Sequence, residues 1–327
     1  MFVLFHAQPP TRASRTAEFM ALFRALESCR RPRSERLFED PLAVEFLRPS
    51  LRLAVLLARV PLLGRIVPGF IDRRWPGARS SGVARTRLID DLLIAALREG
   101  ADQVVLLGAG FDCRAHRLPG IDRSRVFEVD RPATLGAKQA RLRRRLPRLP
   151  GHVVFVEADF EDQDLERVMR SAGFSPITRS FFVWEGVTNY LTANAVDATL
   201  RRVAAVAAPG SRLLFTYVHR GLLDGSIAFP GGRRLSRTLR RIGEPWTFGL
   251  DPAEVSGFLA QRGFRLLEDW GAADYRSRYL GRGADRLRGY EFYRVALAEI
   301  CPGRLGRAPL EAHPTTRESA GDDACPR

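Results

Sequence analysis

Gly108, Gly110 and Asp130 are the residues whose types and spacing point most directly to chemistry. An apolar run, Val104–Leu107, breaks into Gly108-Ala109-Gly110 and then turns polar. A second apolar segment, Arg125–Asp130, ends on an acid 20 residues after Gly110. A glycine turn lets the backbone approach a ligand, and an acid at the end of the next strand of a βαβ unit usually bonds ribose hydroxyls. The spacing therefore predicts a site for a cofactor that contains a nucleoside.

The residues after the two glycines separate two classes of cofactor. A dinucleotide site has the pattern G-x-G-x-x-G, with a pyrophosphate at the following helix N-terminus. Here the third glycine is replaced by Cys113, and the carboxylate of Asp112 lies where the phosphates would bind. An acid-lined turn favours S-adenosylmethionine, which has a ribose and an adenine, no phosphate, and two cationic groups. An NAD site and a tight turn without a ligand remain the alternatives.

Two later apolar segments also end on acids. His152–Ala158 runs into Asp159, and Ser180–Trp184 runs into Glu185. The carboxyl ends of strands in an open α/β sheet form the ligand crevice, so these acids should meet Gly108 and Asp130 at one edge. Each acid taken alone could equally be a helix cap or a solvated loop residue.

The series LLGAGFDCRAHRL, FEVDRPATLGAKQARL, EADFED and WEGVTNYLT resembles the leucine carboxyl methyltransferase group. This group includes bacterial polyketide O-methyltransferases and many actinobacterial S-adenosylmethionine-dependent methyltransferases. The resemblance runs from about Ala17 to Leu297, and ARTRLIDDLL (84–93) resembles the arginine-bearing helix before the first strand. It implies an α/β fold: a Rossmann-like seven-stranded class I methyltransferase sheet with helices on both faces and an antiparallel last strand.

The same resemblance implies a set of cofactor-binding residues. Arg85 matches the arginine that pairs with the carboxylate of S-adenosylmethionine, a role suited to a planar guanidinium. Asp159 and Phe160 match the pair that addresses the adenine. The full set is Arg24, Arg85, Gly108, Gly110, Asp130, Asp159, Phe160 and Glu185.

The methyl acceptor is less well defined than the cofactor. Cys113 stands where relatives commonly have threonine, and Thr188-Asn189 replaces residues that are usually apolar, which leaves the acceptor open. Candidates for the substrate pocket are Tyr190, Tyr217 and His219, each of which could instead be a pocket wall or a loop residue. A carboxylate acceptor needs no general base, whereas a phenol would benefit from one. The catalytic residue therefore stays unknown at this stage.

The pattern divides the 327 residues into a core and flanking parts. Residues 1–84 are expected to form an N-terminal helical lid, and 85–300 the methyltransferase core with an insertion at 221–248. Residues 302–327 are expected to be disordered. The apolar segment Leu51–Phe70 carries several arginines and two prolines, so it is predicted to be amphipathic rather than spanning, packed on the core or lid or touching a membrane surface.

The formal net charge is +15, and arginine supplies all but one of the 52 basic residues. The dense runs Arg141–Arg148 and Arg233–Arg241 could attract nucleic acid, acidic substrates or anionic lipid, or could be solvated helix faces. The four cysteines have no metal-ligand spacing, so no metal is expected. The chain start lacks signal-peptide features, so a cytoplasmic location is expected.

These observations predict O-methylation of a carboxylate or hydroxyl of a small molecule, which could be a polyketide-like metabolite. The family alternatives are methylation of a protein C-terminal carboxyl group or a role connected with tRNA base modification. From other classes, an NAD-linked oxidoreductase and a non-catalytic RNA-binding protein remain open.

Overall fold

A single seven-stranded sheet organises the computed structural model, which describes residues 14–30, 32–60, 64, 66–159, 165–281 and 289–301. The strand order is β3-β2-β1-β4-β5-β7-β6, with β7 antiparallel to both of its neighbours and the pairs from β3 to β5 parallel. The predicted sheet and its antiparallel last strand are thus confirmed. The strands are β1 (Gln103–Leu107), β2 (Arg125–Asp130), β3 (Val153–Glu157), β4 (Ser180–Trp184), β5 (Arg212–Val218), β6 (Phe264–Trp270) and β7 (Tyr293–Ile300).

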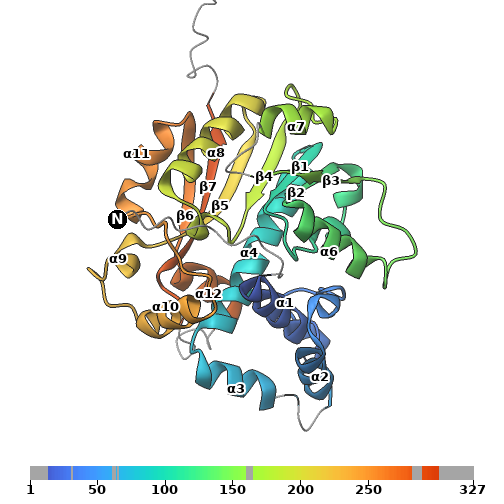
Figure 1. The fold of residues 1–327 in the computed structure, drawn as a ribbon, viewed down its shortest axis with the longest axis vertical. Helices are drawn as coiled ribbons and strands as arrows, with labels where there is room; N and C mark the ends of the chain where they lie inside the picture. The colour runs from blue at the N-terminus through green and yellow to red at the C-terminus, as the bar shows by residue number, and fades with distance from the viewer. Residues whose placement is uncertain are drawn as a thin grey trace, which may run out of the picture.

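Helices cover both faces of this sheet, as predicted (Figure 1). On one face α7, α8 and α11 bury an apolar core against the strands, and on the other face α4 and α12 do so. The central strands β1 and β4 are buried along their whole length, which explains their nearly continuous apolar sequence. The helices on these two faces are α4 (Ala78–Arg98), α7 (Leu165–Ser171), α8 (Ala193–Val206), α11 (Val255–Ala260) and α12 (Ala272–Leu280).

Two helices after the fourth and fifth strands have clear local signals. Thr192 caps α8 by accepting from the amide of Ala195. The second helix is short. Asp251 caps a 3₁₀ turn, Pro252–Glu254, which leads into α11.

The N-terminal region forms a separate apolar core on the carboxyl edge of the sheet. It contains α1 (Arg15–Glu27), α2 (Pro49–Ala58), α3 (Ile66–Arg74) and two 3₁₀ turns, η1 (Arg33–Glu35) and η2 (Ala43–Phe46). Phe111 and Cys113, from the loop after β1, are buried in this core, and the ring of Phe111 stacks on Phe46. The N-terminal helices therefore rest directly on the loop that was predicted to bind a cofactor.

The helix α4 joins this region to the sheet without a break. Its first part faces the N-terminal core, where Gly82 packs closely against Met20 and Phe23. Its second part, from Leu88 to Ala96, packs on the sheet. The boundary predicted at residue 84 thus falls inside one continuous helix.

The segment after β5 holds the short helices α9 (Arg220–Leu223) and α10 (Gly232–Arg241). It packs on an aromatic cluster that includes Phe229, Trp246 and Phe292. The remaining helical segments are α5 (Arg114–Arg117), α6 (Pro132–Leu142), η3 (Ile121–Arg123) and η4 (Thr188–Tyr190). The predicted tail, 302–327, lies outside the described residues.

Glu244, just after α10, connects this segment to the start of α1. Its carboxylate accepts hydrogen bonds from the amides of Arg15 (2.7 Å) and Thr16 (3.1 Å) and from the hydroxyls of Ser14 (3.2 Å) and Thr16. The first amides of a helix have no partner within the helix, so a carboxylate from a distant segment satisfies them here.

Replacing Glu244 with Ala should therefore loosen α1. We expect the free energy of unfolding to fall by about 1–2 kcal/mol, as for the loss of a helix cap, and limited proteolysis to cleave the N-terminal region faster. The measurements are urea denaturation and a protease time course. Glu254→Ala is the matched control, because it removes an acid that pairs with Arg220 at the surface. Equal effects of the two substitutions would contradict the role given to Glu244.

Candidate active site

The carboxyl edge of the parallel strands gathers most of the predicted cofactor residues. Gly108 follows β1, Asp130 ends β2, Asp159 follows β3 and Glu185 follows β4. Asp130 lies directly against the glycine turn, since its Oδ2 accepts a hydrogen bond from the amide of Gly110 at 2.7 Å. The structure therefore brings the ends of β1 and β2 together as the spacing predicted.

The turn after β1 requires glycine for two different reasons. Gly108 and Gly110 both have positive φ, +68° and +39°, a region that side chains rarely adopt. A Cβ on Gly108 would also lie 2.4 Å from Cγ2 of Val187, whereas a Cβ on Gly110 would meet nothing closer than the oxygen of Gly108 at 3.7 Å. The first glycine thus allows close packing, and the second leaves the backbone open to a ligand.

The carboxylate of Asp130 is held by two backbone amides. Oδ2 accepts from Gly110 and Oδ1 from Arg131, each at 2.7 Å. Burial raises the pKa of Asp130 above its ordinary value, although these hydrogen bonds oppose the shift. A carboxylate has about four lone-pair positions, and the hydroxyl of Thr134 lies against this one as well, so a position remains for a ribose hydroxyl.

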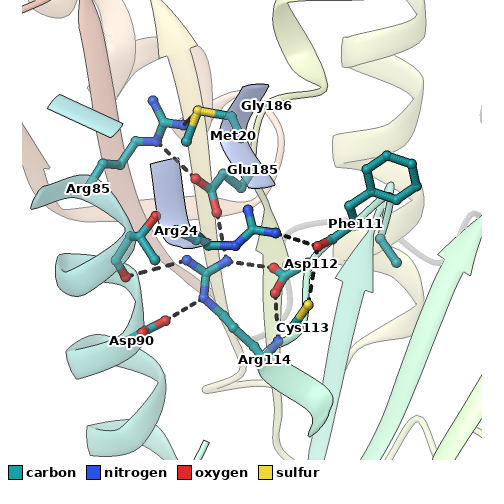
Figure 2. A network of polar contacts seen from close by, with 12 residues as sticks. Met20, Arg24, Arg85, Asp90, Phe111, Asp112, Cys113, Arg114, Glu185 and Gly186 are labelled. Atoms are coloured by element: carbon teal, nitrogen blue, oxygen red, sulfur yellow. Dashed lines mark hydrogen bonds and ion pairs between the residues drawn. The ribbon is translucent and has the colours of Figure 1, made fainter. Parts of the chain in front are cut away.

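Arg85 and Glu185 form an ion pair across the edge of the sheet. Nε of Arg85 lies 2.9 Å from Oε1 of Glu185 (Figure 2). The guanidinium also lies 4.3 Å from the ring centre of Tyr293. Burial would raise the pKa of Glu185, but the nearby guanidinium groups of Arg114 and Arg85 lower it below its ordinary value. A fixed cation and a fixed anion therefore stand side by side next to the cofactor turn.

Arg114, which was not among the predicted site residues, connects three of the acids. It is almost fully buried, and it donates to Asp90 (2.7 Å), to Asp112 (2.5 Å) and to Glu185 (2.7 Å) (Figure 2). The pKa of Asp112 is accordingly held well below its ordinary value: burial would raise it, and Arg114 outweighs that effect. Asp112 is therefore ionised, and it shares the single positive charge of Arg114 with Asp90 and Glu185.

The network extends from Arg114 to the N-terminal region. Arg117 bonds Asp90 (2.7 Å) and lies 3.7 Å from Asp40, and Asp40 in turn accepts from Arg24 (2.8 Å). Arg24 also donates to the carbonyl oxygen of Phe111 at 2.5 Å. The predicted residue Arg24 therefore holds the loop after β1. In all, four arginines and four acids make up this network, in which Arg114 pairs with two further acids besides Asp90: Arg24, Asp40, Arg117, Asp90, Arg114, Asp112, Glu185 and Arg85.

A second buried charge cluster lies beneath the glycine turn. Nζ of Lys138, the chain's only lysine, is 2.8 Å from Glu128, which also lies 3.2 Å from His116. The same ammonium donates to the carbonyl oxygen of Ala109 at 3.3 Å. Lys138 therefore supports the middle residue of the Gly108–Gly110 turn from below.

The two residues predicted to address the adenine differ in what the structure shows. Asp159 lies at the exposed end of the edge, with Oδ2 3.2 Å from Nε of Arg131. Phe160 lies outside the described residues.

The three predicted pocket residues are held in different ways. Tyr190, in η4, lies beside Thr16 of α1, and burial raises its pKa to about 12. The hydroxyl of Tyr217 donates to Asp269 in β6 at 2.8 Å, and Nδ1 of His219 accepts from the amide of Gly221 at 3.0 Å. Only Tyr190 is thus placed between the β4 loop and the N-terminal helices.

The motif positions that depart from the family pattern are buried. Burial raises the pKa of the Cys113 thiol well above its ordinary value, and the hydroxyl of Thr188 donates to the backbone of Thr216 at 2.5 Å. Asn189 is also buried, at 1% exposure. Across the described part of the chain, no group of three or more His, Cys, Asp or Glu side chains could hold a metal ion.

Sequence comparisons identify related proteins over most of the chain. A family model described as leucine carboxyl methyltransferase matches residues 17–204. A Frankia alni protein named as an S-adenosyl-L-methionine-dependent methyltransferase is 36% identical over 219 residues, 66% of this chain and 72% of that protein. A Parafrankia protein with the same kind of name is 33% identical over 265 residues, 80% of this chain and 79% of that protein.

Two crystal structures share the fold. A Thermobifida fusca protein described as a methyltransferase has a TM-score of 0.54 and 17% identity, covering 90% of this chain and all of that one. A Streptomyces avermitilis protein of family duf574 has a TM-score of 0.55 and 15% identity, covering 85% and 96%. At these identities the likeness shows the fold alone.

Replacing Arg114 with Met should destabilise the protein strongly, because buried Asp90 and the half-buried Asp112 and Glu185 lose their shared partner. We expect the free energy of unfolding to fall by about 3–5 kcal/mol, the usual cost of breaking a buried ion pair, in urea denaturation. The matched control is Arg212→Met, which removes a partly exposed pair with Glu99 and should cost less than about 1 kcal/mol. Similar losses in both variants would mean that the network stabilises no more than a surface pair does.

Proposed function

The chain belongs to the leucine carboxyl methyltransferase family and is an S-adenosylmethionine-dependent methyltransferase, and on this basis we propose that it methylates a carboxylate or hydroxyl oxygen of a small molecule. The observation that carries the proposal is the Arg85–Glu185 pair beside the open turn at Gly110 and the carboxylate of Asp130. Family membership disfavours the two other classes left open by the sequence, an NAD-linked oxidoreductase and a non-catalytic RNA-binding protein.

The donor set fits the cofactor group by group. The methionine end of S-adenosylmethionine carries a carboxylate and an ammonium, which match the guanidinium of Arg85 and the carboxylate of Glu185. Asp130 retains an acceptor position for a ribose hydroxyl. Asp159 and Phe160 are assigned to the adenine, and Gly108 and Gly110 to the backbone beneath the methionine. Arg24 is assigned to the same site, which it supports by fixing the loop at Phe111.

The main catalytic task of the protein is to align the methyl group of the cofactor with the acceptor oxygen. S-adenosylmethionine supplies a methyl group on a cationic sulfur, which an oxygen nucleophile displaces in line. The fixed charges of Arg85 and Glu185 would orient the methionine end, and the N-terminal helices would exclude water. A pKa near 12 keeps the hydroxyl of Tyr190 protonated at neutral pH, so it can donate a hydrogen bond to an acceptor but cannot act as its base.

An acceptor that is already ionised suits these groups best. A carboxylate needs no general base, and the only predicted pocket residue placed beneath the N-terminal helices is a hydrogen-bond donor. We therefore place a carboxylate acceptor ahead of a hydroxyl acceptor.

Calorimetric titration with S-adenosylmethionine, S-adenosylhomocysteine and NAD tests the cofactor assignment. The wild-type chain should bind the two sulfur ligands and not NAD. Asp130→Asn should weaken both by about 100-fold, because charge-assisted hydrogen bonds to the ribose are lost. Glu254→Gln, at the surface away from the edge, is the control and should bind as wild type does. Unchanged binding by a folded Asp130→Asn variant would remove Asp130 from the site.

Product chemistry tests the acceptor assignment. The chain is incubated with cofactor labelled at the methyl group and with matched pairs of small carboxylic acids and phenols. A methyl ester releases labelled methanol in mild alkali, whereas an aryl methyl ether does not. We expect alkali-labile label from small acids. Alkali-stable label would indicate a hydroxyl acceptor, and label found only on added protein or tRNA would contradict a small-molecule acceptor.

A further inference from the structure

An exposed apolar face is formed by the helices α2 and α3 of the N-terminal region, which lie at the lower end of the molecule in Figure 1. Of eight large apolar side chains that are exposed in the described part of the chain, six belong to this face. They are Leu53, Leu56, Leu57 and Val60 on and just after α2, and Ile66 and Phe70 on α3. Their spacing of three, four and seven residues on α2 and four on α3 places them along one side of each helix.

Both helices are apolar on two sides. Val55 and Ala58 of α2 and Ile71 of α3 are buried in the N-terminal core. The six exposed apolar side chains lie outside this core and do not contribute to its burial. Phe70 remains 65% exposed and Leu53 57%. Contiguous exposed apolar side chains of this kind usually mark an interaction surface.

A cavity lined by arginines lies between α3 and α10. Its volume is about 320 Å³, and its lining consists of Arg74, Arg234, Arg237, Thr238 and Arg241. The sequence of α10 contains no acid, and its five arginines make no ion pair with the described acids. Four guanidinium groups around one space form a binding site for anions such as phosphate groups.

The apolar face and the arginine cavity are continuous. Ile66, Phe70 and Arg74 follow one another at intervals of four residues on α3, so they lie along the same stripe of the helix. The stripe therefore passes from exposed apolar side chains directly into the lining of the cavity.

We propose that this combined surface, the α2–α3 apolar face with the arginine cavity, docks the protein on an anionic membrane surface. The apolar side chains would enter the boundary between headgroups and acyl chains, and the arginines would bind lipid phosphate groups. No helix within the described residues is long and apolar enough to cross a membrane, and this mode of binding requires none.

Two other occupants fit the surface less well. A nucleic acid would use the arginines but would leave six apolar side chains without a function. A second copy of this chain, docked by the same face, would bring the arginines of both copies close together. An anionic bilayer is the partner that uses both halves of the surface.

Cosedimentation of the full chain with lipid vesicles tests the proposal. One set of vesicles is phosphatidylcholine alone, and in the other about a third of the lipid is phosphatidylglycerol. We expect binding to the anionic vesicles, weakened by high salt, and little binding to the neutral ones. The apolar variant Leu56→Ser/Phe70→Ser should weaken binding about tenfold, and the arginine variant Arg234→Gln/Arg237→Gln/Arg241→Gln about 100-fold.

Matched control variants distinguish binding through this surface from nonspecific electrostatic or hydrophobic binding to vesicles. Arg143→Gln/Arg144→Gln/Arg145→Gln removes the same charge from the end of α6, which stands apart from α3 and α10 in Figure 1. Ile177→Ser removes an isolated exposed apolar side chain. Both controls should bind vesicles nearly as wild type does, and all variants should keep wild-type affinity for S-adenosylmethionine, which also shows that they fold.

Three outcomes would overturn the proposal. The first is no binding of the wild-type chain to anionic vesicles. The second is an equal loss of binding in the α6 control and the α10 variant. The third is that vesicle binding stays intact while another interaction is lost. This would be a loss of RNA affinity in the α10 variant, or a loss of dimer on gel filtration in the apolar variant. Each result is independent of whether the methyl acceptor has been assigned correctly.

Discussion

The buried guanidinium of Arg114 is the interaction on which the arrangement of this site depends. It holds Asp90 of α4, Asp112 of the loop after β1 and Glu185 of the loop after β4 within hydrogen-bond distance of a single side chain. These three segments are far apart in sequence, and each carries or adjoins a residue assigned to the cofactor. A buried charge without a partner is costly, so Arg114 fixes this helix and the two loops relative to one another.

The network also determines what a ligand must do on entering. Arg85 and Glu185 satisfy each other in the absence of a ligand. A zwitterionic ligand can replace this internal pair with two external ones, and it leaves no buried charge unpaired in either state. A ligand with a single charge would pair with either Arg85 or Glu185 and would leave the other without a partner. Selectivity for the methionine end can therefore come from charge balance, in addition to shape.

The sequence predicted the elements of this structure better than the contacts between them. The strands, the glycine turn and the position of Asp130 follow from local pattern, because apolar runs and positive-φ glycines are decided by neighbouring residues. The roles of Arg114 and Asp90 could not be derived in this way, although both lie in the motifs that carry the family resemblance. Their partners are separated by up to 71 residues, as for Arg114 and Glu185, and an arginine looks the same in sequence whether it is solvated or buried. The same holds for Lys138, which is fully buried against Glu128.

The unbroken course of α4 has a mechanical consequence. One rigid helix carries the contacts to Met20 and Phe23 at one end, Arg85 in the middle, and the residues packed on the sheet at the other. The N-terminal helices cannot swing as a hinged flap about residue 84, because the hinge would have to break this helix. An opening that leaves α4 intact would have to involve the elements before it, α1 to α3, and would leave Arg85 in place on α4. The guanidinium of Arg85, to which we assign the methionine carboxylate, thus lies on the same unbroken helix that packs on the sheet.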